Sequence, residues 1–252
     1  MSESQSSTHI IVVGGHTRSI GKTQLVCDII AALPEANWVA GKITQYGHGV
    51  CAQNGHDCNC SPDEHVCAID WERDATTGTD SSRFLAAGAQ CSFWLRTKQG
   101  FLAEGMPLLR TALDEIASSR TTGSTQADIE PRSVEARHAV PPSAINVILE
   151  SNTLLQFLKP DLFLMVLHPG KSDFKDSSRF QLNRASAFVL REPLPANAGD
   201  QRYATSWPSV PLQLLHGKPQ FLQRENGPLP VPLLEMIRYH ACNKPLVPSI
   251  KM

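Results

Sequence analysis

The sequence has no apolar run long enough to span a membrane and no excess of charge of either sign. No stretch approaches the roughly 18 apolar residues of a transmembrane helix. The first eight residues are polar and carry no basic side chain, and the apolar run Ile10–Val13 is too short for a signal peptide. The 23 Lys and Arg residues balance 24 Asp and Glu residues, which leaves no overall field to hold a nucleic acid or an anionic membrane. We therefore expect a cytoplasmic protein that binds neither nucleic acid nor membranes. Any anion that it binds must be held by a local cluster of residues.

The composition does supply a hydrophobic core. The 252 residues are 41% hydrophobic and 19% charged, which suits one α/β domain of good size or one domain with a small appendage. No internal repeat is present, but ten of the 18 prolines lie between Pro193 and Pro248. We expect a main domain over residues 1–192, with a Cys/His-rich insertion over 48–70, and a Pro-rich C-terminal extension over 193–252.

Apolar periodicity predicts strands that alternate with helices. The β-branched run His9–Val13 is typical of a strand buried on both faces. After a glycine-containing turn, apolar residues recur at helical spacing over residues 24–33, which predicts a helix. Further strands are expected over 38–44, 90–96, 144–149, 161–167 and, as the last of the sheet, 186–190, with helices over 80–88, 105–118, 153–158 and 233–240 and with loops over 45–70 and 120–143. This alternation predicts an α/β fold with helices on both faces of a mainly parallel sheet.

The segment between the first strand and the first helix has the ending of a phosphate-binding loop. Its sequence is GGHTRSIGKT, residues 14–23, which we call the P-loop. Backbone N–H groups of such a loop and the positive end of the helix hold phosphate oxygens, Lys22 would reach the β- and γ-phosphates, and Thr23 would ligate Mg²⁺. The usual glycine six residues before the lysine is replaced by His16. The expected nucleotide-binding residues here are Gly15, His16, Thr17, Arg18, Ser19, Ile20, Gly21, Lys22, Thr23 and Gln24.

A carboxylate at the end of another predicted strand could complete a magnesium site. Glu150 follows the apolar run INVIL, and polar residues at strand ends of such sheets face the ligand. We expect Lys22 and Glu150 to be the catalytic residues; the alternative is that Glu150 merely places charge at the start of the next helix. The pair Asn243-Lys244 lacks the following aspartate of a guanine-recognition motif, so ATP and GTP both stay open.

Four landmarks in order resemble molybdopterin-guanine dinucleotide biosynthesis protein B (MobB), a family of P-loop NTPases. They are the P-loop GGHTRSIGKTQL, the strand AGKITQYGH, the segment GTDSSRFLAAGA and the strand end VILESN. The resemblance implies a three-layer α/β P-loop NTPase fold with a mainly parallel sheet, nucleotide binding, the homodimers common in the family, and a role in molybdenum cofactor biosynthesis. It also implies that Lys42 and Asp80 line the nucleotide or Mg²⁺ site with Lys22, Thr23 and Glu150. His16, the cysteine-rich insertion and the Pro-rich tail depart from the family pattern.

Four cysteines crowd into residues 51–67, which suggests metal in a cytoplasmic chain. Cys51, Cys58 and Cys60, with His65 or Cys67 as the fourth ligand, could bind zinc in a closed structural site. An iron–sulfur cluster is the less favoured metal centre, and a reduced loop without metal is the plainer alternative.

This metal assignment predicts zinc in the purified protein. We expect about one equivalent per chain, and its loss in a Cys58→Ser/Cys60→Ser variant, because a site with two of four ligands removed cannot hold the ion. Elemental analysis measures the metal, and metal-free protein with all thiols rapidly alkylated would contradict the assignment.

Charged residues also follow the predicted strand 161–167, in the segment HPGKSDFKDSSR. Lys171, Asp173, Lys175 and Arg179 stand there, at the edge of the sheet where ligands bind. They could contact an anion, or they could form an ordinary solvated loop.

These features favour a Mg²⁺-dependent ATP- or GTP-binding protein with NTPase or kinase-like activity, whose acceptor is water, a small molecule or a protein. The alternative from another class is a non-catalytic nucleotide-binding adapter or metallochaperone that delivers cofactor or metal to a partner. A third interpretation is a zinc-stapled binding module with a vestigial P-loop.

Overall fold

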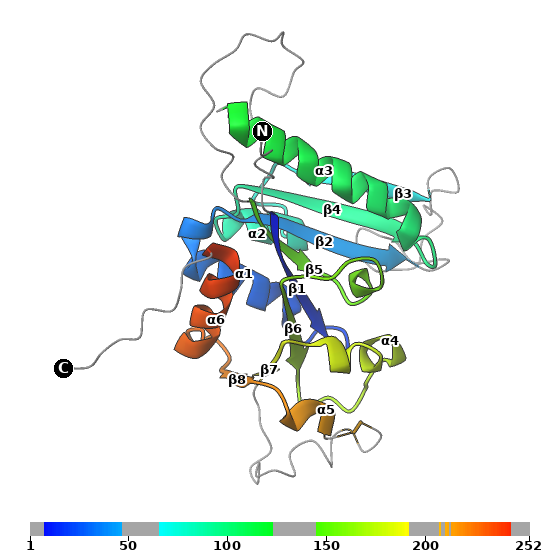
Figure 1. The fold of residues 1–252 in the computed structure, drawn as a ribbon, viewed down its shortest axis with the longest axis vertical. Coiled ribbons are helices and arrows are strands. Elements are labelled where there is room, and N and C mark those ends of the chain that lie inside the picture. Colours follow the sequence, from blue (N-terminus) through cyan, green and yellow to red (C-terminus); the bar gives the residue numbers. More distant parts are fainter. Residues whose placement is uncertain are drawn as a thin grey trace, which may run out of the picture.

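The computed structural model describes residues 8–46, 66–122, 145–191, 207, 210, 211 and 213–242. Its centre is one eight-stranded sheet of order β3-β4-β2-β5-β1-β6-β7-β8 (Figure 1). Every adjacent pair is parallel except β3 and β4. The strands are β1 (Thr8–Gly15), β2 (Val39–Tyr46), β3 (Cys67–Glu72), β4 (Cys91–Lys98), β5 (Ile145–Glu150), β6 (Leu162–Leu167), β7 (Ala187–Arg191) and β8 (Gln220–Gln223).

Helices cover both faces of the sheet. They are α1 (Lys22–Ala32), α2 (Asp80–Ala86), α3 (Leu102–Thr122), α4 (Asp176–Arg179), α5 (Gln213–His216) and α6 (Val231–Cys242), with short 3₁₀ turns at Pro34–Ala36, Leu154–Gln156 and Leu182–Arg184. Buried residues of α1, α2 and α6 pack in one core cluster, and those of α3 and α5 pack in a second. Figure 1 shows α1 and α6 beside each other, whereas α3 runs along β3 and β4. The three-layer α/β arrangement is therefore present.

The strand that leads into the P-loop lies in the middle of the sheet. Ile11 and Val13 are fully buried in the core under α1, and Val12 is fully buried in the core on the opposite face. Burial on both faces is what a continuous apolar run predicts for a central parallel strand. The carboxyl ends of β1, β2, β5 and β6 consequently meet at one edge of the sheet.

Two expectations about the elements are wrong. The loop expected over 45–70 ends earlier, because Cys67–Glu72 forms β3, an edge strand antiparallel to β4. Ile69 and Trp71 are partly buried and pack against the core. The sequence offers only these two apolar positions alternating with polar ones, which is too short a pattern to predict the strand.

The sheet also continues past the strand expected to be its last. β8 pairs in parallel with β7, and Leu233 and Ile237 of α6 are fully buried in the core under α1. Residues beyond 192 thus add a strand and a helix to the same sheet and core. A four-residue strand among many prolines leaves almost no periodic signal in the sequence. Within the described residues, no helix combines the length and apolarity that crossing a membrane requires.

Candidate functional site

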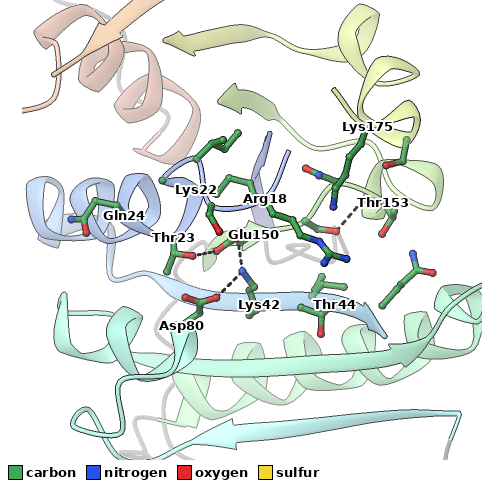
Figure 2. Close-up of a pocket in the computed structure, with 18 of the residues that line it drawn as sticks. Arg18, Lys22, Thr23, Gln24, Lys42, Thr44, Asp80, Glu150, Thr153 and Lys175 are labelled. Atoms are coloured by element: carbon green, nitrogen blue, oxygen red, sulfur yellow. Dashed lines mark hydrogen bonds and ion pairs between the residues drawn. The ribbon is translucent and has the colours of Figure 1, made fainter. Parts of the chain in front are cut away.

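A cavity of about 660 Å³ opens at the carboxyl edge of the sheet, where β1, β2 and β5 end (Figure 2). Polar and charged side chains dominate its lining. The lining residues are Arg18–Gln24 of the P-loop and α1, Lys42–Gln45 of β2, Asp80 and Arg83 of α2, Glu150–Thr153 after β5, and Lys175 and Ser177 near α4.

The P-loop conformation exposes backbone N–H groups at the start of α1. Gly21 has a φ of 84°, in the left-handed region that glycine adopts without strain, and Ser19 has a φ of 50°. The first hydrogen bond of α1 runs from the N–H of Leu25 to the carbonyl of Gly21. The N–H groups of the three residues before Leu25 therefore have no acceptor within the helix, and together with the helix dipole they suit an anion.

Lys22 and Thr23 carry the polar groups of this helix start. The ammonium of Lys22 donates to the carbonyl of Thr17 at 3.0 Å, so the side chain folds back over the loop. Burial lowers the pKa of Lys22, and the charge of Lys42 adds to this effect while Glu150 opposes it. The Thr23 hydroxyl donates to Oε2 of Glu150 at 2.7 Å.

Lys42 joins the two carboxylates of the cavity. Lys42 and Glu150 are register partners on β2 and β5, which places their side chains next to each other. Nζ of Lys42 lies 2.5 Å from Oε1 of Glu150 and 2.8 Å from Oδ2 of Asp80. Glu150 is only 2% exposed, so its charge needs this partner. Burial acts against the ammonium of Lys42, but the attraction of both carboxylates outweighs it and raises the pKa of Lys42.

His16, at the position of the usual glycine, points away from the cavity. Its side chain is fully buried, with its ring centroid 5.1 Å from that of Phe174 and 4.9 Å from that of Trp207. Its Nε2 lies 3.3 Å from the carbonyl of Lys171, and its Nδ1 accepts from the N–H of His168 at 3.4 Å. Because the ring faces the other side of the loop, a histidine here does not fill the space where phosphate would bind.

Burial lowers the pKa of His16 from its usual 6.5 to about 4. The unfolded chain therefore binds a proton between about pH 6.5 and 4 that the folded chain does not, so this group's contribution to stability is complete above pH 6.5 and is lost as the pH falls. We expect the unfolding free energy to gain up to about 3 kcal/mol from His16 across that window. Urea unfolding of wild type and of His16→Gln at several pH values gives the unfolding free energy of each protein as a function of pH. The same pH dependence in both proteins would contradict this assignment.

The loop after β6 braces the P-loop from behind. Lys171 donates from Nζ to the carbonyl of Ser19 at 2.9 Å, and Asp173 accepts from the hydroxyl of Thr17. Of the charged residues expected to meet an anion there, Lys175 lines the cavity. Lys171 and Asp173 hold the loop, and Arg179 lies over the ring of Phe174.

Gly15, the second glycine of the P-loop, is also fixed by side chains that the sequence pattern did not single out. Asn152 accepts from the N–H of Gly15 at 2.7 Å, and the hydroxyl of Ser178 donates to the carbonyl of Gly15 at 2.9 Å. A Cβ added to Gly15 would lie 2.6 Å from Cδ1 of Ile20 and 3.0 Å from Cδ of Lys22, so a larger residue here would displace the ends of both side chains. The signal for Asn152 was its place two residues after Glu150 at the strand end; Ser178 gives none in the sequence.

The structure thus brings together most of the expected nucleotide-site residues. Residues 18–24 of the P-loop and α1, with Lys42, Asp80 and Glu150, line one cavity. Gly15, His16 and Thr17 do not line it. Arg83, Thr44 and Thr153 line it without having been expected.

Most of the proposed zinc ligands lie outside the described residues: Cys51, Cys58, Cys60 and His65. Cys67 is described, begins β3 and donates from Sγ to the carbonyl of Glu104 at 3.5 Å. Among the residues that can be described, no three His, Cys, Asp or Glu side chains gather to hold a metal. Cys67 pairs with Thr97 near the carboxyl end of β4, which is the cavity's edge of the sheet.

A glycine loop with a Lys-Thr ending, set between a central parallel strand and a helix, is the arrangement of P-loop NTPases. No protein-family model matches the chain, and no curated protein matches it in sequence. Among solved structures, it is similar to HypB from Helicobacter pylori in complex with nickel, with 11% identity and a TM-score of 0.48 over 95% of this chain and 90% of that one. It is also similar to the Zn(II)-bound YjiA GTPase from E. coli, with 12% identity and a TM-score of 0.41 over 90% of this chain and 61% of that one.

Proposed function

We propose that this chain binds Mg-ATP or Mg-GTP and transfers the γ-phosphoryl group to water or to another acceptor. The observation that carries the proposal is the convergence of Lys22, Thr23 and Glu150 at one cavity, with the Thr23 hydroxyl 2.7 Å from the Glu150 carboxylate. A lysine, a hydroxyl and a carboxylate at the end of a glycine loop are the groups that nucleoside-triphosphate chemistry needs.

The donor set fits magnesium. The Thr23 hydroxyl and the Glu150 carboxylate offer hard oxygen ligands, which Mg²⁺ prefers. When bound, the ion neutralises charge on the phosphates. The Lys22 ammonium exchanges the Thr17 carbonyl for phosphate oxygens, which stabilise its charge better than a neutral carbonyl. During transfer, an acceptor oxygen forms a bond to the γ-phosphorus and releases its proton to solvent, while the bond to the bridging oxygen breaks. The electron pair stays with the departing diphosphate.

Lys42 has a positioning role in this proposal. Its raised pKa keeps it charged at neutral pH, and it ties Glu150 and Asp80 to each other across β2. In the nucleotide-free protein, the attraction of this lysine to both carboxylates offsets the repulsion between them.

Two finer proposals rest on the sequence. Zinc held by Cys51, Cys58 and Cys60, with His65 or Cys67, would make the loop after β2 a structural metal site near the nucleotide. The resemblance to the MobB family supports molybdenum cofactor biosynthesis as the setting and a homodimer as the assembly.

Phosphate release from Mg-ATP and Mg-GTP tests the catalytic part. We expect slow turnover by wild type that disappears in Lys22→Ala, because the lysine stabilises charge on the transferring group. Binding without turnover, alone and with candidate acceptors, would instead favour the non-catalytic adapter or metallochaperone. Absence of binding to either nucleotide would favour the metal-stapled module with a vestigial P-loop.

A further inference from the structure

The end of the cavity farthest from Thr23 has positive charge that the nucleotide site does not use. Five basic side chains and two carboxylates line the cavity. Both carboxylates are engaged elsewhere, since Glu150 and Asp80 pair with Lys42, and Asp80 also lies 3.9 Å from Arg83. The positive charge that remains belongs to Lys22, which the nucleotide site uses, and to Arg18 and Lys175, which it does not.

Arg18 and Lys175 come from different segments and meet in this end of the cavity. Figure 2 shows both side chains directed toward the region of Thr44 and Thr153, away from Thr23 and Asp80. Within the described parts of the chain, neither the Arg18 guanidinium nor the Lys175 ammonium has a hydrogen-bond or ion-pair partner. Burial and the nearby charge of Arg18 lower the pKa of Lys175, while Asp173 opposes them. Two like charges held together in this way are stabilised by an anion between them.

Neutral hydrogen-bonding groups complete the same region. The hydroxyls of Thr153 and Ser177 line the cavity and have no partner among the described residues, and they can donate to an oxyanion. Thr44 already accepts from the indole of Trp94 at 2.8 Å, which leaves its own hydroxyl proton for a ligand. The guanidinium of Arg18 suits the two oxygens of a phosphate or a carboxylate, which its parallel N–H groups bind together.

We propose that Arg18 and Lys175 form an acceptor subsite that binds the oxyanion of a second, small anionic substrate beside the nucleotide. The inference rests on the proposed function, since it names the class of the phosphoryl acceptor: a small molecule with a phosphate or carboxylate group. Arg18 stands four residues before Lys22 on the P-loop, which puts the two sites next to each other. An anion held there is oriented toward the nucleotide without occupying the start of α1.

Binding of inorganic phosphate to the nucleotide-loaded protein tests the subsite. The full chain, saturated with Mg²⁺ and a non-hydrolysable analogue of ATP or GTP, is titrated calorimetrically with phosphate and separately with acetate. We expect saturable phosphate binding with a Kd on the order of millimolar, weakened at least about 10-fold in Arg18→Ala/Lys175→Ala. Arg179→Ala removes a cation of α4 that does not line the cavity, and it should bind phosphate like wild type. Acetate binding at the same residues would identify a carboxylate as an equally good oxyanion.

Several results would overturn the subsite. One is phosphate binding that is unchanged in the double variant or absent from wild type. Another is a double variant that loses affinity for the nucleotide analogue by the same factor as for phosphate, because the two cations would then hold the nucleotide's own phosphates. If wild type binds no nucleotide, the proposed function fails separately. In that case, phosphate is titrated into nucleotide-free Lys22→Ala protein. The subsite stands only if this binding is weakened when Arg18 and Lys175 are also replaced by alanine.

Discussion

Replacing Lys22 with alanine should weaken binding of Mg-ATP and Mg-GTP at least about 100-fold. Losing a buried, charge-assisted contact typically costs about 2–5 kcal/mol, and about 2.7 kcal/mol corresponds to that factor. The nucleotide-free fold should not suffer, because the Lys22 ammonium pays a burial penalty and bonds only a backbone carbonyl, that of Thr17. Calorimetric titration measures the affinity, and thermal unfolding without nucleotide checks the fold.

Lys159→Ala provides the matched control for this variant. Lys159 is exposed and lies outside the cavity lining, so its removal changes the net charge by the same amount without touching the P-loop. We expect wild-type affinity in the control. Equal losses in both variants would mean that the effect comes from overall charge, and unchanged binding in Lys22→Ala would remove the P-loop from the account.

Replacing Glu150 with glutamine should raise the Mg²⁺ concentration needed for nucleotide binding at least about 10-fold and lower any turnover about 100-fold or more. A neutral amide is a much poorer Mg²⁺ ligand than a carboxylate, and catalysis of phosphoryl transfer depends on charge stabilisation. The unfolding free energy of the variant should also fall, by no more than about 5 kcal/mol, because Lys42 loses its buried partner. Nucleotide affinity measured across Mg²⁺ concentrations gives the first effect, and urea unfolding gives the last.

Asp80→Asn separates the metal role of Glu150 from its pairing with Lys42. Asp80 also contacts Lys42 at 2.8 Å, but its side chain is 38% exposed, whereas the Glu150 side chain is 3% exposed. We expect a smaller loss of stability and a smaller change in Mg²⁺ dependence. If the two variants respond alike to Mg²⁺, the strand-end glutamate has no special place in the metal site.

The sequence was most informative where a local signal and the topology agree. The apolar run of β1, the glycines and the Lys-Thr ending predicted a central strand and the start of α1, and both are present. The strand end at Glu150 predicted a carboxylate near Thr23, because the ends of parallel strands share one edge. The resemblance to the MobB family implied that Lys42 belongs to the same site, and the register of β2 with β5 places it next to Glu150.

What the sequence could not predict depends on contacts between distant residues. The place of the His16 ring is set by Lys171, 155 residues further along the chain, and by Trp207, so no local pattern shows which way it points. Arg18 becomes half of a cation pair only because the loop after β6 brings Lys175 to the same cavity. β8 is too short to show a period and was hidden among prolines.

Calorimetric titration of the wild-type chain with Mg-ATP and with Mg-GTP tests the central claim most directly. The account predicts saturable binding of at least one nucleotide at one site per chain, dependent on Mg²⁺. Binding of neither nucleotide, by folded protein at concentrations well above micromolar, would contradict it.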